Sequence, residues 1–285
     1  MIIDFHTHIF PSFIRDDRTP FFFKEPSFKT LYNNSGVVLA GRSELVRDMD
    51  AEGIDKSIVF GFPWKKNVLF KRHNDYILES ILKYPSRLIG FCCFDFLTRG
   101  AAEEAERCLK AGMAGIGELA VYESDFSPDI IDRLGDIMAL CSEYDAPILL
   151  HTNEPVGHYY PGKQLMSLSQ LYSLLKRYPS NRIILAHWGG GLFFYGLMKR
   201  ELRDVLKNVW FDTAASPYLY TPEIYRIAVD IVGADKILFG SDYPLIKQGR
   251  YFKEMEQSGI SQDSIRHITG HNVRQLLSIQ SSEDS

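Results

Sequence analysis

The sequence predicts an α/β fold, a TIM (β/α)8 barrel in a single domain that spans residues 1–285. Three observations favour this fold. Eight short apolar runs recur along the 285 residues, a longer segment with helical spacing follows each run, and most runs are continuously apolar. Continuous apolar runs are typical of parallel strands that are buried on both faces. Strand and helix repeated eight times in succession are the signature of a closed barrel.

The expected strands are rich in Ile, Val, Leu and Phe. They cover Ile2–Phe5, Lys56–Gly61, Leu88–Phe94, Gly115–Val121, Ile148–His151, Ile183–His187, Val209–Thr213 and Ile237–Gly240. An open doubly wound sheet is the structural alternative. Such a sheet would not usually use eight units in succession, and no GxGxxG motif follows the first strand.

The expected helices lie between these runs and are bounded by residues that commonly start or stop helices. Ser43–Glu52 begins with a serine and ends before Gly53, and Ser127–Tyr144 has a proline in its first turn. The other expected helices cover Asn74–Lys83, Gly100–Ala111, Ser167–Tyr178, Phe194–Leu206, Thr221–Gly233 and Asp263–Ser278.

One segment, residues 10–42 after the first strand, breaks this alternation. It shows no strong periodicity, but it is rich in aromatic residues, among them Phe21, Phe28 and Tyr32. A long irregular segment inside a compact domain is often a lid or a binding loop. We expect this insertion to cap the active site, and a contact between two copies of the chain is the alternative.

Composition excludes several classes of partner. The net charge is −4 and no basic stripe is present, so we expect no nucleic acid partner. No apolar run approaches the ~20 residues that span a bilayer, so we expect no membrane association. The four cysteines include no CxxC pair, which indicates reduced thiols and a cytoplasmic protein. A homodimer is the default expectation for a soluble enzyme that acts on a small-molecule substrate.

Residues with metal-binding side chains stand at the ends of five expected strands. His6 and His8 end the first strand, and the remaining ones are Glu118, His151, His187 and Asp242. Residues two apart in a strand point to the same side, so His6 and His8 face together. The carboxyl ends of parallel strands in a barrel surround one mouth, where active sites lie. A single histidine at such a place is often a hydrogen-bonded core residue, but several together indicate a site.

This set of imidazoles and carboxylates suits a divalent metal. Zn is the first expectation, with Mn, Fe or Co as alternatives. A metal-bound water would be acidified into a nucleophile near neutral pH. A metal-binding protein without catalytic activity is an alternative, although the ligand set is complete. Two other histidines, His73 and His267, are expected on the surface.

The motifs that carry these residues resemble a known family. The opening Asp4–Pro11, the Ala186–Gly190 and Phe211–Thr213 segments, Leu238–Pro244 and the closing Ile268–Leu277 are similar to amidohydrolase-related (amidohydrolase 2) proteins of the aminocarboxymuconate-semialdehyde decarboxylase type. The resemblance covers the whole chain in the same motif order. It implies that His6, His8, His151 and Asp242 bind a divalent metal, usually Zn. It also implies that His187 polarises the substrate or assists proton transfer and that Asp242 acts as a base toward the metal-bound water.

Glu118 departs from this decarboxylase pattern. In the hydrolase branches of the superfamily a carboxylate on the fourth strand can bridge two metals, so Glu118 is expected to be a ligand and the site to hold one or possibly two ions. The alternative is that Glu118 accepts a hydrogen bond from a ligand histidine. On this basis the first expectation is hydrolysis of an ester, lactone or amide by a metal-activated water.

The alternative reaction is non-oxidative decarboxylation of a small unsaturated or aromatic acid on the same centre. A decarboxylase needs a cation that holds the substrate carboxylate, and Lys65, Lys66 and Arg72 follow the second strand as candidates. For either reaction we expect Trp64, His158 and Trp188 to contact the substrate, because small-molecule pockets are mostly lined by apolar and aromatic side chains.

Overall fold

Eight parallel strands form one sheet, and their order in space follows the chain from β1 to β8. The structure, a computed structural model, describes residues 1–122 and 125–279. The strands are β1 (Ile3–His8), β2 (Lys56–Phe60), β3 (Leu88–Cys92), β4 (Gly115–Leu119), β5 (Ile148–Leu150), β6 (Ile183–Leu185), β7 (Val209–Asp212) and β8 (Ile237–Leu238). Seven of them lie within the expected runs. The exception is β1, which begins one residue later and ends three residues later than expected.

The sheet closes between β1 and the segment at and after β8. The backbone N–H of Phe5 donates to the oxygen of Phe239 at 2.7 Å, and that of His8 donates to the oxygen of Tyr243 at 2.8 Å. Thr7 and Tyr243 also form a parallel bridge. The predicted (β/α)8 barrel is therefore confirmed.

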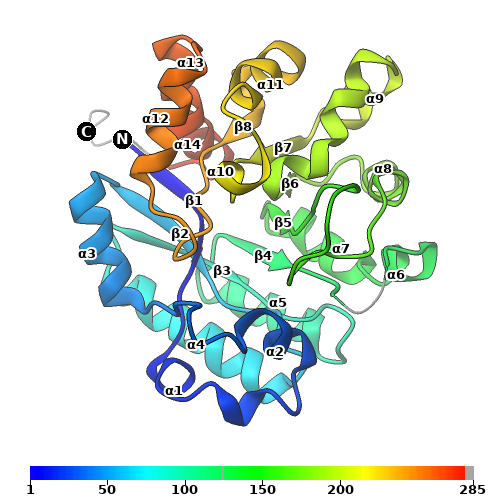
Figure 1. Ribbon diagram of the computed structural model, residues 1–285. Coiled ribbons are helices and arrows are strands. Elements are labelled where there is room, and N and C mark those ends of the chain that lie inside the picture. The colour runs from blue at the N-terminus through cyan, green and yellow to red at the C-terminus, as the bar shows by residue number, and fades with distance from the viewer. Residues whose placement is uncertain (123–124, 280–285) are drawn as a thin grey trace.

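Helices surround this barrel and connect its strands (Figure 1). They are α1 (Ser12–Arg15), η1 (Thr19–Phe21), α2 (Pro26–Tyr32), α3 (Arg42–Glu52), α4 (Asn67–Lys83), α5 (Ala101–Lys110), α6 (Pro128–Asp132), α7 (Gly135–Glu143), α8 (Leu168–Arg177), η2 (His187–Leu197), α9 (Glu201–Val205), α10 (Ser216–Leu219), α11 (Ile224–Val232), η3 (Ala234–Lys236), α12 (Gly249–Gln257), α13 (Gln262–Arg266), η4 (His267–His271) and α14 (Asn272–Leu276). Within the described residues, no helix is both long and apolar enough to cross a membrane.

Two buried apolar clusters hold the barrel together. The smaller one takes alternate residues from the strands, such as Ile58 and Phe60 of β2, and is joined by Val273 and Leu276 of α14. These side chains fill the barrel interior, as expected for a barrel of eight strands. The larger cluster lies between the strands and the surrounding helices. The interior is therefore a packed core, and the polar residues gather at its carboxyl end.

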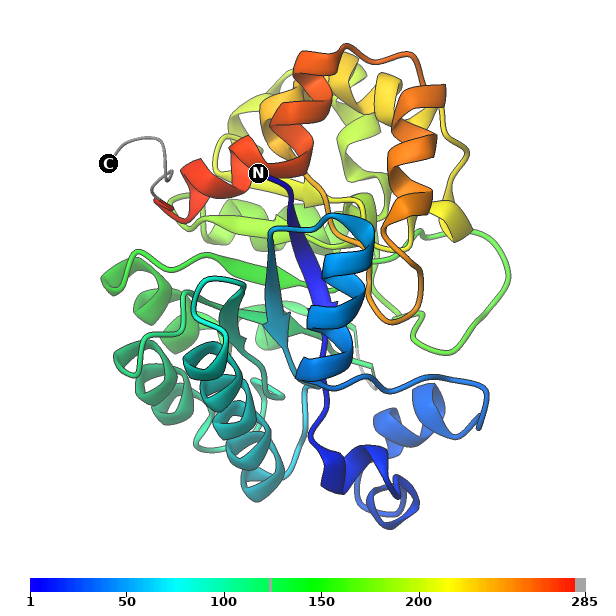
Figure 2. The same cartoon turned by 90° about the vertical axis from the view of Figure 1, so that its left-hand side faces the viewer.

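The insertion after β1 is built from the short helices α1, η1 and α2. Figure 2 shows β1 running toward this segment, which lies at the carboxyl end of the strand. Phe28 of α2 contacts two residues that follow β2, with ring centroids 5.3 Å from Phe62 and 4.5 Å from Trp64. Helices of three to seven residues are too short to give a helical period in the sequence.

Several helices differ from the expected ones. Helix α4 begins seven residues before the expected start at Asn74, and the expected helix Ser127–Tyr144 is divided into α6 and α7. In place of the expected helix Phe194–Leu206 lie the end of η2 and the short α9, and η2 itself is kinked because residues 188–191 have positive, non-helical φ angles. The expectation of a surface His73 is wrong. This residue is fully buried on α4, where its ring packs against Gly61.

Candidate metal centre

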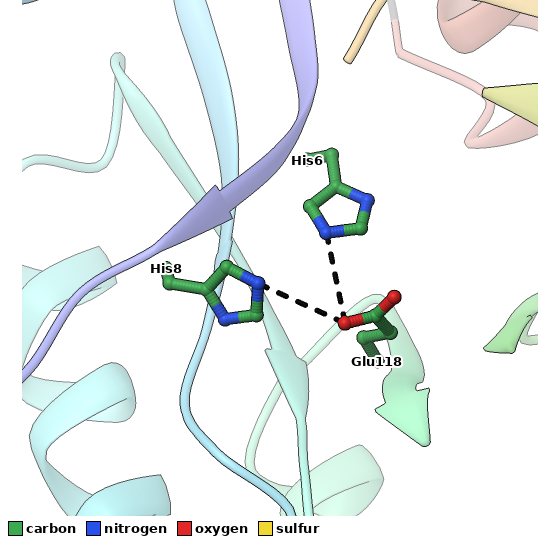
Figure 3. A group of neighbouring side chains, drawn as sticks. All are labelled: His6, His8 and Glu118. Carbon is green, nitrogen blue, oxygen red and sulfur yellow. Dashed lines mark ion pairs between the residues drawn. The ribbon is translucent and has the colours of Figure 1, made fainter. Parts of the chain in front are cut away.

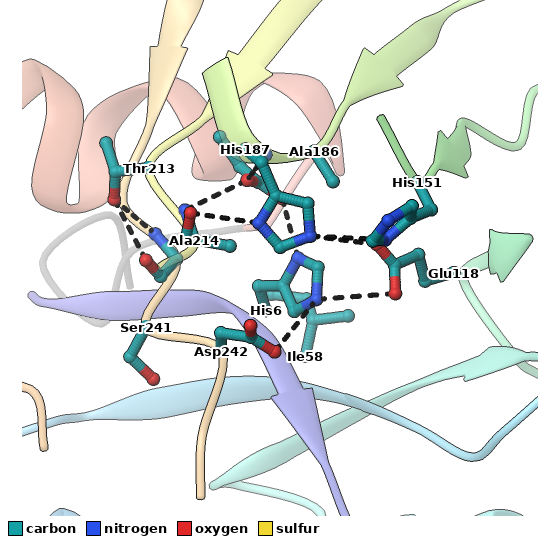
Figure 4. Close-up of polar contacts among 12 residues, drawn as sticks. His6, Ile58, Glu118, His151, Ala186, His187, Thr213, Ala214, Ser241 and Asp242 are labelled. Carbon is teal, nitrogen blue, oxygen red and sulfur yellow. Dashed lines mark hydrogen bonds and ion pairs between the residues drawn. The ribbon is translucent and has the colours of Figure 1, made fainter. Parts of the chain in front are cut away.

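The carboxyl ends of five strands bring six polar side chains into the barrel mouth. They are His6 and His8 of β1, Glu118 of β4, His151 directly after β5, His187 two residues after β6 and Asp242 after β8. Figure 4 shows five of them, each from a different strand or strand end, pointing toward one another. The sequence therefore identified residues that meet in space, because parallel strands of a barrel place their ends together.

A first group of four ligand atoms brings two histidine nitrogens close to two carboxylate oxygens. His6 Nε2 lies 3.7 Å from Glu118 Oε2 and 3.6 Å from Asp242 Oδ1. His8 Nε2 lies 3.7 Å and 3.5 Å from the same two oxygens. Figure 3 shows both imidazoles directed at Glu118. These separations exceed hydrogen-bond lengths, but they match the ~3.4 Å between ligands that lie ~2.1 Å from a tetrahedral ion.

Hydrogen bonds on the other ring nitrogens orient both imidazoles. His6 Nδ1 lies 2.7 Å from Asp212 Oδ2, and His8 Nδ1 lies 3.1 Å from the carbonyl oxygen of Gly61. Since both of these oxygens accept, each ring in its neutral form carries its proton on Nδ1 and turns the lone pair of Nε2 to the centre. Among the described residues, the buried Nε2 of His6 has no hydrogen-bond partner. A buried polar atom without a partner indicates a water or an ion at that place.

A second group of three ligand atoms shares the Glu118 carboxylate. Glu118 Oε1 lies 2.9 Å from His151 Nδ1 and 3.5 Å from His187 Nε2, and these two nitrogens are 3.2 Å apart. The outer nitrogens donate to backbone carbonyls: His151 Nε2 to Gly162 at 3.1 Å, and His187 Nδ1 to Ala214 at 3.0 Å. Within the described residues, the ligand atoms of His6, His8 and Glu118 lie within 4.8 Å of one another, and so do those of Glu118, His151 and His187, as the ligands of a metal ion would.

The electrostatics of the centre favour positive charge. Burial lowers the pKa of His6, but the charges of Asp212, Glu118 and Asp242 outweigh burial and raise it to about 10. Burial likewise lowers the pKa of His187, and Glu118 and Asp242 raise it to about 9. Burial raises the pKa of Asp242, while the surrounding histidines lower it to about 2. The carboxylates thus attract either protons or a cation.

Two buried carboxylates that the sequence did not single out lie next to the centre. Asp212 at the end of β7 contacts His6, as described above. Asp4 of β1 accepts hydrogen bonds from the hydroxyl and the backbone N–H of Ser241 and from the side chain of Gln248. The available signal was a carboxylate within an apolar strand, since such a group is buried only with partners.

Aromatic residues line the surroundings of the centre. The Tyr122 ring lies 5.6 Å from that of His151 and stacks on Phe62, which in turn lies 5.9 Å from Tyr32 of the insertion. Burial, followed by the charges of Asp242 and Glu118, raises the pKa of Tyr32. The insertion therefore contributes an aromatic side chain close to the ligand groups.

The three residues expected to contact substrate lie in different environments. Trp64 and Trp188 are completely buried, and their indole N–H groups donate to His73 and Ser216 respectively, each at 2.9 Å. His158 is exposed in the loop after β5. These substrate contacts stay predictions.

The candidate cations after β2 make contacts of their own. The backbone N–H groups of Lys65 and Lys66 both donate to the buried carboxylate of Glu25, each at 3.0 Å. The guanidinium carbon of Arg72 lies 3.8 Å from the centre of the Phe13 ring. These contacts attach the insertion to the segment after β2.

The sequence and the fold are similar to those of known proteins. The sequence profile of the Amidohydrolase family matches residues 3–279. The chain belongs to this family. The expected resemblance is thereby confirmed, and the barrel and the motif order fit it along nearly the whole length.

Two relatives carry named activities. The chain is 24% identical over 290 residues to a gamma-resorcylate decarboxylase of Polaromonas sp., with 82% of this chain and 86% of the relative covered. It is 22% identical over 264 residues to a 2-amino-3-carboxymuconate-6-semialdehyde decarboxylase of Dictyostelium discoideum, with 78% and 70% covered.

Solved structures show the same fold. A 5-carboxyvanillate decarboxylase from Sphingomonas paucimobilis superposes with a TM-score of 0.75 at 14% identity, over 98% of this chain and 99% of that one. A dihydroxybenzoic acid decarboxylase from Polaromonas sp., solved with bound manganese and an inhibitor, has a TM-score of 0.70 at 21% identity and covers 99% and 98%.

These comparisons overturn the expectation of hydrolysis. The named relatives and structural neighbours are mainly decarboxylases, so the hydrolase prediction drawn from Glu118 is wrong, and its decarboxylase alternative agrees better. The physical reason is that a carboxylate among imidazoles does not specify a reaction. Glu118 lies beside four histidines, where it can anchor rings or ligate an ion whatever bond is broken.

Proposed function

We propose that this chain is a metal-dependent decarboxylase that removes CO2 from a small aromatic or unsaturated carboxylic acid without an oxidant. The observation that carries the proposal is the group of four ligand atoms around the unpartnered Nε2 of His6. The activities named for the relatives favour decarboxylation over other reactions of such a centre.

The residues present fit a divalent ion. His6, His8, Glu118 and Asp242 would hold it, since each of the two histidine nitrogens lies 3.5 to 3.7 Å from both carboxylate oxygens. This donor set suits Zn, Mn, Fe or Co. Manganese is favoured as the first choice, since it is bound in a structure of the same fold. When bound, the ion supplies positive charge that holds substrate oxygens and stabilises developing negative charge.

Whether His151 binds the same ion or a second one is a finer question. Its Nδ1 faces Glu118 Oε1 and His187, on the other side of the shared carboxylate from His6 and His8. A second ion bridged by Glu118 would satisfy both nitrogens. A single proton shared within this group would do so as well. Metal content per chain distinguishes the two arrangements.

His187 is the residue we assign to proton transfer. Decarboxylation breaks the bond between a carbon atom and the carboxylate, and that carbon must receive a proton. Nδ1 of His187 is committed to the carbonyl of Ala214, so Nε2 is the atom that holds and donates the proton. Its raised pKa of about 9 keeps the proton in place at neutral pH. The base role expected of Asp242 stays a prediction.

The surroundings suit a planar substrate. Tyr32, Phe62 and Tyr122 place aromatic rings beside the centre, and ring faces stack on flat ligands. We therefore propose that the substrate is a small acid of this shape. A homodimer stays a prediction, as do the cap role of residues 10–42 and the cytoplasmic location.

The test measures CO2 release from a panel of hydroxylated benzoates and unsaturated diacids. Protein is stripped with a chelator, reloaded with Mn or Zn, and compared with His187→Asn and with the exposed control His271→Asn. We expect release only from reloaded protein, a loss of about 100-fold or more in His187→Asn, and no loss in the control. Products of hydrolysis or hydration without any CO2 would contradict the proposal.

A further inference from the structure

A buried carboxylate outside the ligand groups connects the two histidines with the principal roles. Asp212 lies at the end of β7 and is completely buried. No lysine or arginine pairs with it among the described ion pairs, and its recorded ion-pair partner is His6. A carboxylate in such a place is held by hydrogen bonds, and those bonds define what it does.

One oxygen of Asp212 determines which nitrogen of His6 is protonated. Oδ2 lies 2.7 Å from His6 Nδ1, and an ionised carboxylate can only accept. The proton of a neutral His6 ring is therefore on Nδ1, and the lone pair is on Nε2. This is the atom that faces Glu118 and Asp242. Carboxylates that accept from the outer nitrogen of a histidine ligand also make its inner nitrogen more basic.

The other oxygen holds the backbone that orients His187. Oδ1 accepts the backbone N–H of His187 at 2.9 Å and that of Ala214 at 3.0 Å. The carbonyl of Ala214 in turn accepts from Nδ1 of His187 at 3.0 Å, as Figure 4 shows. His187 also has a positive φ of 55°, so its backbone is held in a conformation that non-glycine residues rarely adopt.

We propose that Asp212 is a positioning residue of the metal centre. It directs the lone pair of His6 Nε2 toward the metal and, through the backbone at His187 and Ala214, orients the His187 ring so that its Nε2 faces the same mouth. This inference rests on the proposed function, because it assigns a role within that centre. In this proposal Asp212 itself contacts neither the ion nor the substrate.

The substitution Asp212→Asn tests this role sharply. The asparagine oxygen can still accept from both backbone N–H groups, but the amide nitrogen then faces His6 Nδ1 and can only donate. The ring is driven to carry its proton on Nε2, which removes the ligand lone pair. We expect Mn and Zn to bind 10- to 100-fold more weakly, as measured by competition with a chelator. We also expect kcat to fall more than KM rises.

The matched control is Asp4→Asn. Asp4 is equally buried, lies on β1, and accepts four hydrogen bonds, but it bonds no histidine ring. We expect a comparable drop in the urea midpoint with metal dissociation constants within about threefold of the wild type. If Asp212→Asn retains wild-type metal affinity, or if both variants lose affinity equally, Asp212 has only a structural role and the inference is wrong.

A measurement on unmodified protein covers the case in which Asp212→Asn does not fold. Nitrogen NMR of histidine-labelled, Zn-loaded wild type should show His6 with a protonated Nδ1 and a metal-bound Nε2, and the reverse would overturn the inference. The two proposals fail separately. Protein that binds metal with this tautomer but releases no CO2 contradicts only the proposed function, whereas protein that takes up no metal contradicts both.

Discussion

The buried His73 makes a quantitative prediction about acid stability. Its Nδ1 accepts from the Trp64 indole at 2.9 Å, and its Nε2 donates to the carbonyl oxygen of Ile9 at 2.7 Å. Ile9 directly follows the candidate ligand His8, so this bond anchors the end of β1. Burial lowers the pKa of His73 from 6.5 to about 4. Protonation would place a second donor against the Trp64 N–H.

The change in the free energy of unfolding with pH follows from the difference between the pKa of His73 in the folded and in the unfolded chain. The folded-state pKa lies below the unfolded one, so the unfolded chain binds the proton more readily between pH 6.5 and 4. The stability contributed by neutral His73 is present above pH 6.5 and is lost as the pH falls toward 4. A difference of about 2.5 pKa units corresponds to about 3.4 kcal/mol in total, of which about 2 kcal/mol is lost between pH 7.5 and 5.

The assay is urea unfolding of wild type, His73→Gln and the exposed control His271→Gln at pH 7.5 and 5. The comparison between variants is needed because burial raises the pKa of Asp4 to about 6, and this group favours the folded state as the pH falls. We expect the wild type and the control to lose about 2 kcal/mol more than His73→Gln. Equal losses in all three would refute the reasoning.

Three further predictions concern the centre and its frame. Glu118→Gln should lower metal content per chain, measured by elemental analysis, from two to one if Glu118 bridges two ions; unchanged content would show that it is not needed as a ligand. Gly190→Ala should cost at least about 2 kcal/mol in urea unfolding, because its φ is +59° and a Cβ would overlap the carbonyl oxygen of Asn153. Gly53→Ala, at φ +71° with open space, should cost only about 1 kcal/mol, and equal costs would contradict this account. Saturating metal, at about 100 times its dissociation constant, should stabilise the stripped protein by about 2.7 kcal/mol in the same assay; an unchanged midpoint would count against a metal centre.

The fold could be predicted because burial leaves a direct mark on the sequence. Strands such as Ile183–Leu185 are buried on both faces, so their side chains are apolar without alternation. Helix bounds were less predictable. Helix α12 (Gly249–Gln257) was not expected at all. The kink in η2 was not predicted either, although a Cβ at Gly189 or Gly190 would overlap Phe211 or Asn153, which lie far away in sequence.

The candidate centre was predictable where residue type and strand end coincide. His6, His8 and Asp242 meet because the barrel places strand ends together, and no pairwise knowledge was needed. The roles of Asp212 and the buried His73 were not predicted, because they depend on partners far away in sequence. His6 lies 206 positions from Asp212, and the residues next to either one in sequence do not indicate the contact. The reaction was not predicted correctly for a different reason, because the same set of metal ligands is compatible with several types of reaction.

The most direct test of a metal centre at these residues is anomalous X-ray diffraction from crystals soaked with Mn. The account predicts one strong anomalous peak about 2.0–2.3 Å from His6 Nε2, His8 Nε2, Glu118 Oε2 and Asp242 Oδ1. A second peak beside His151 and His187 would indicate two ions. The absence of any peak among these side chains, in crystals that carry manganese elsewhere, would contradict the central claim.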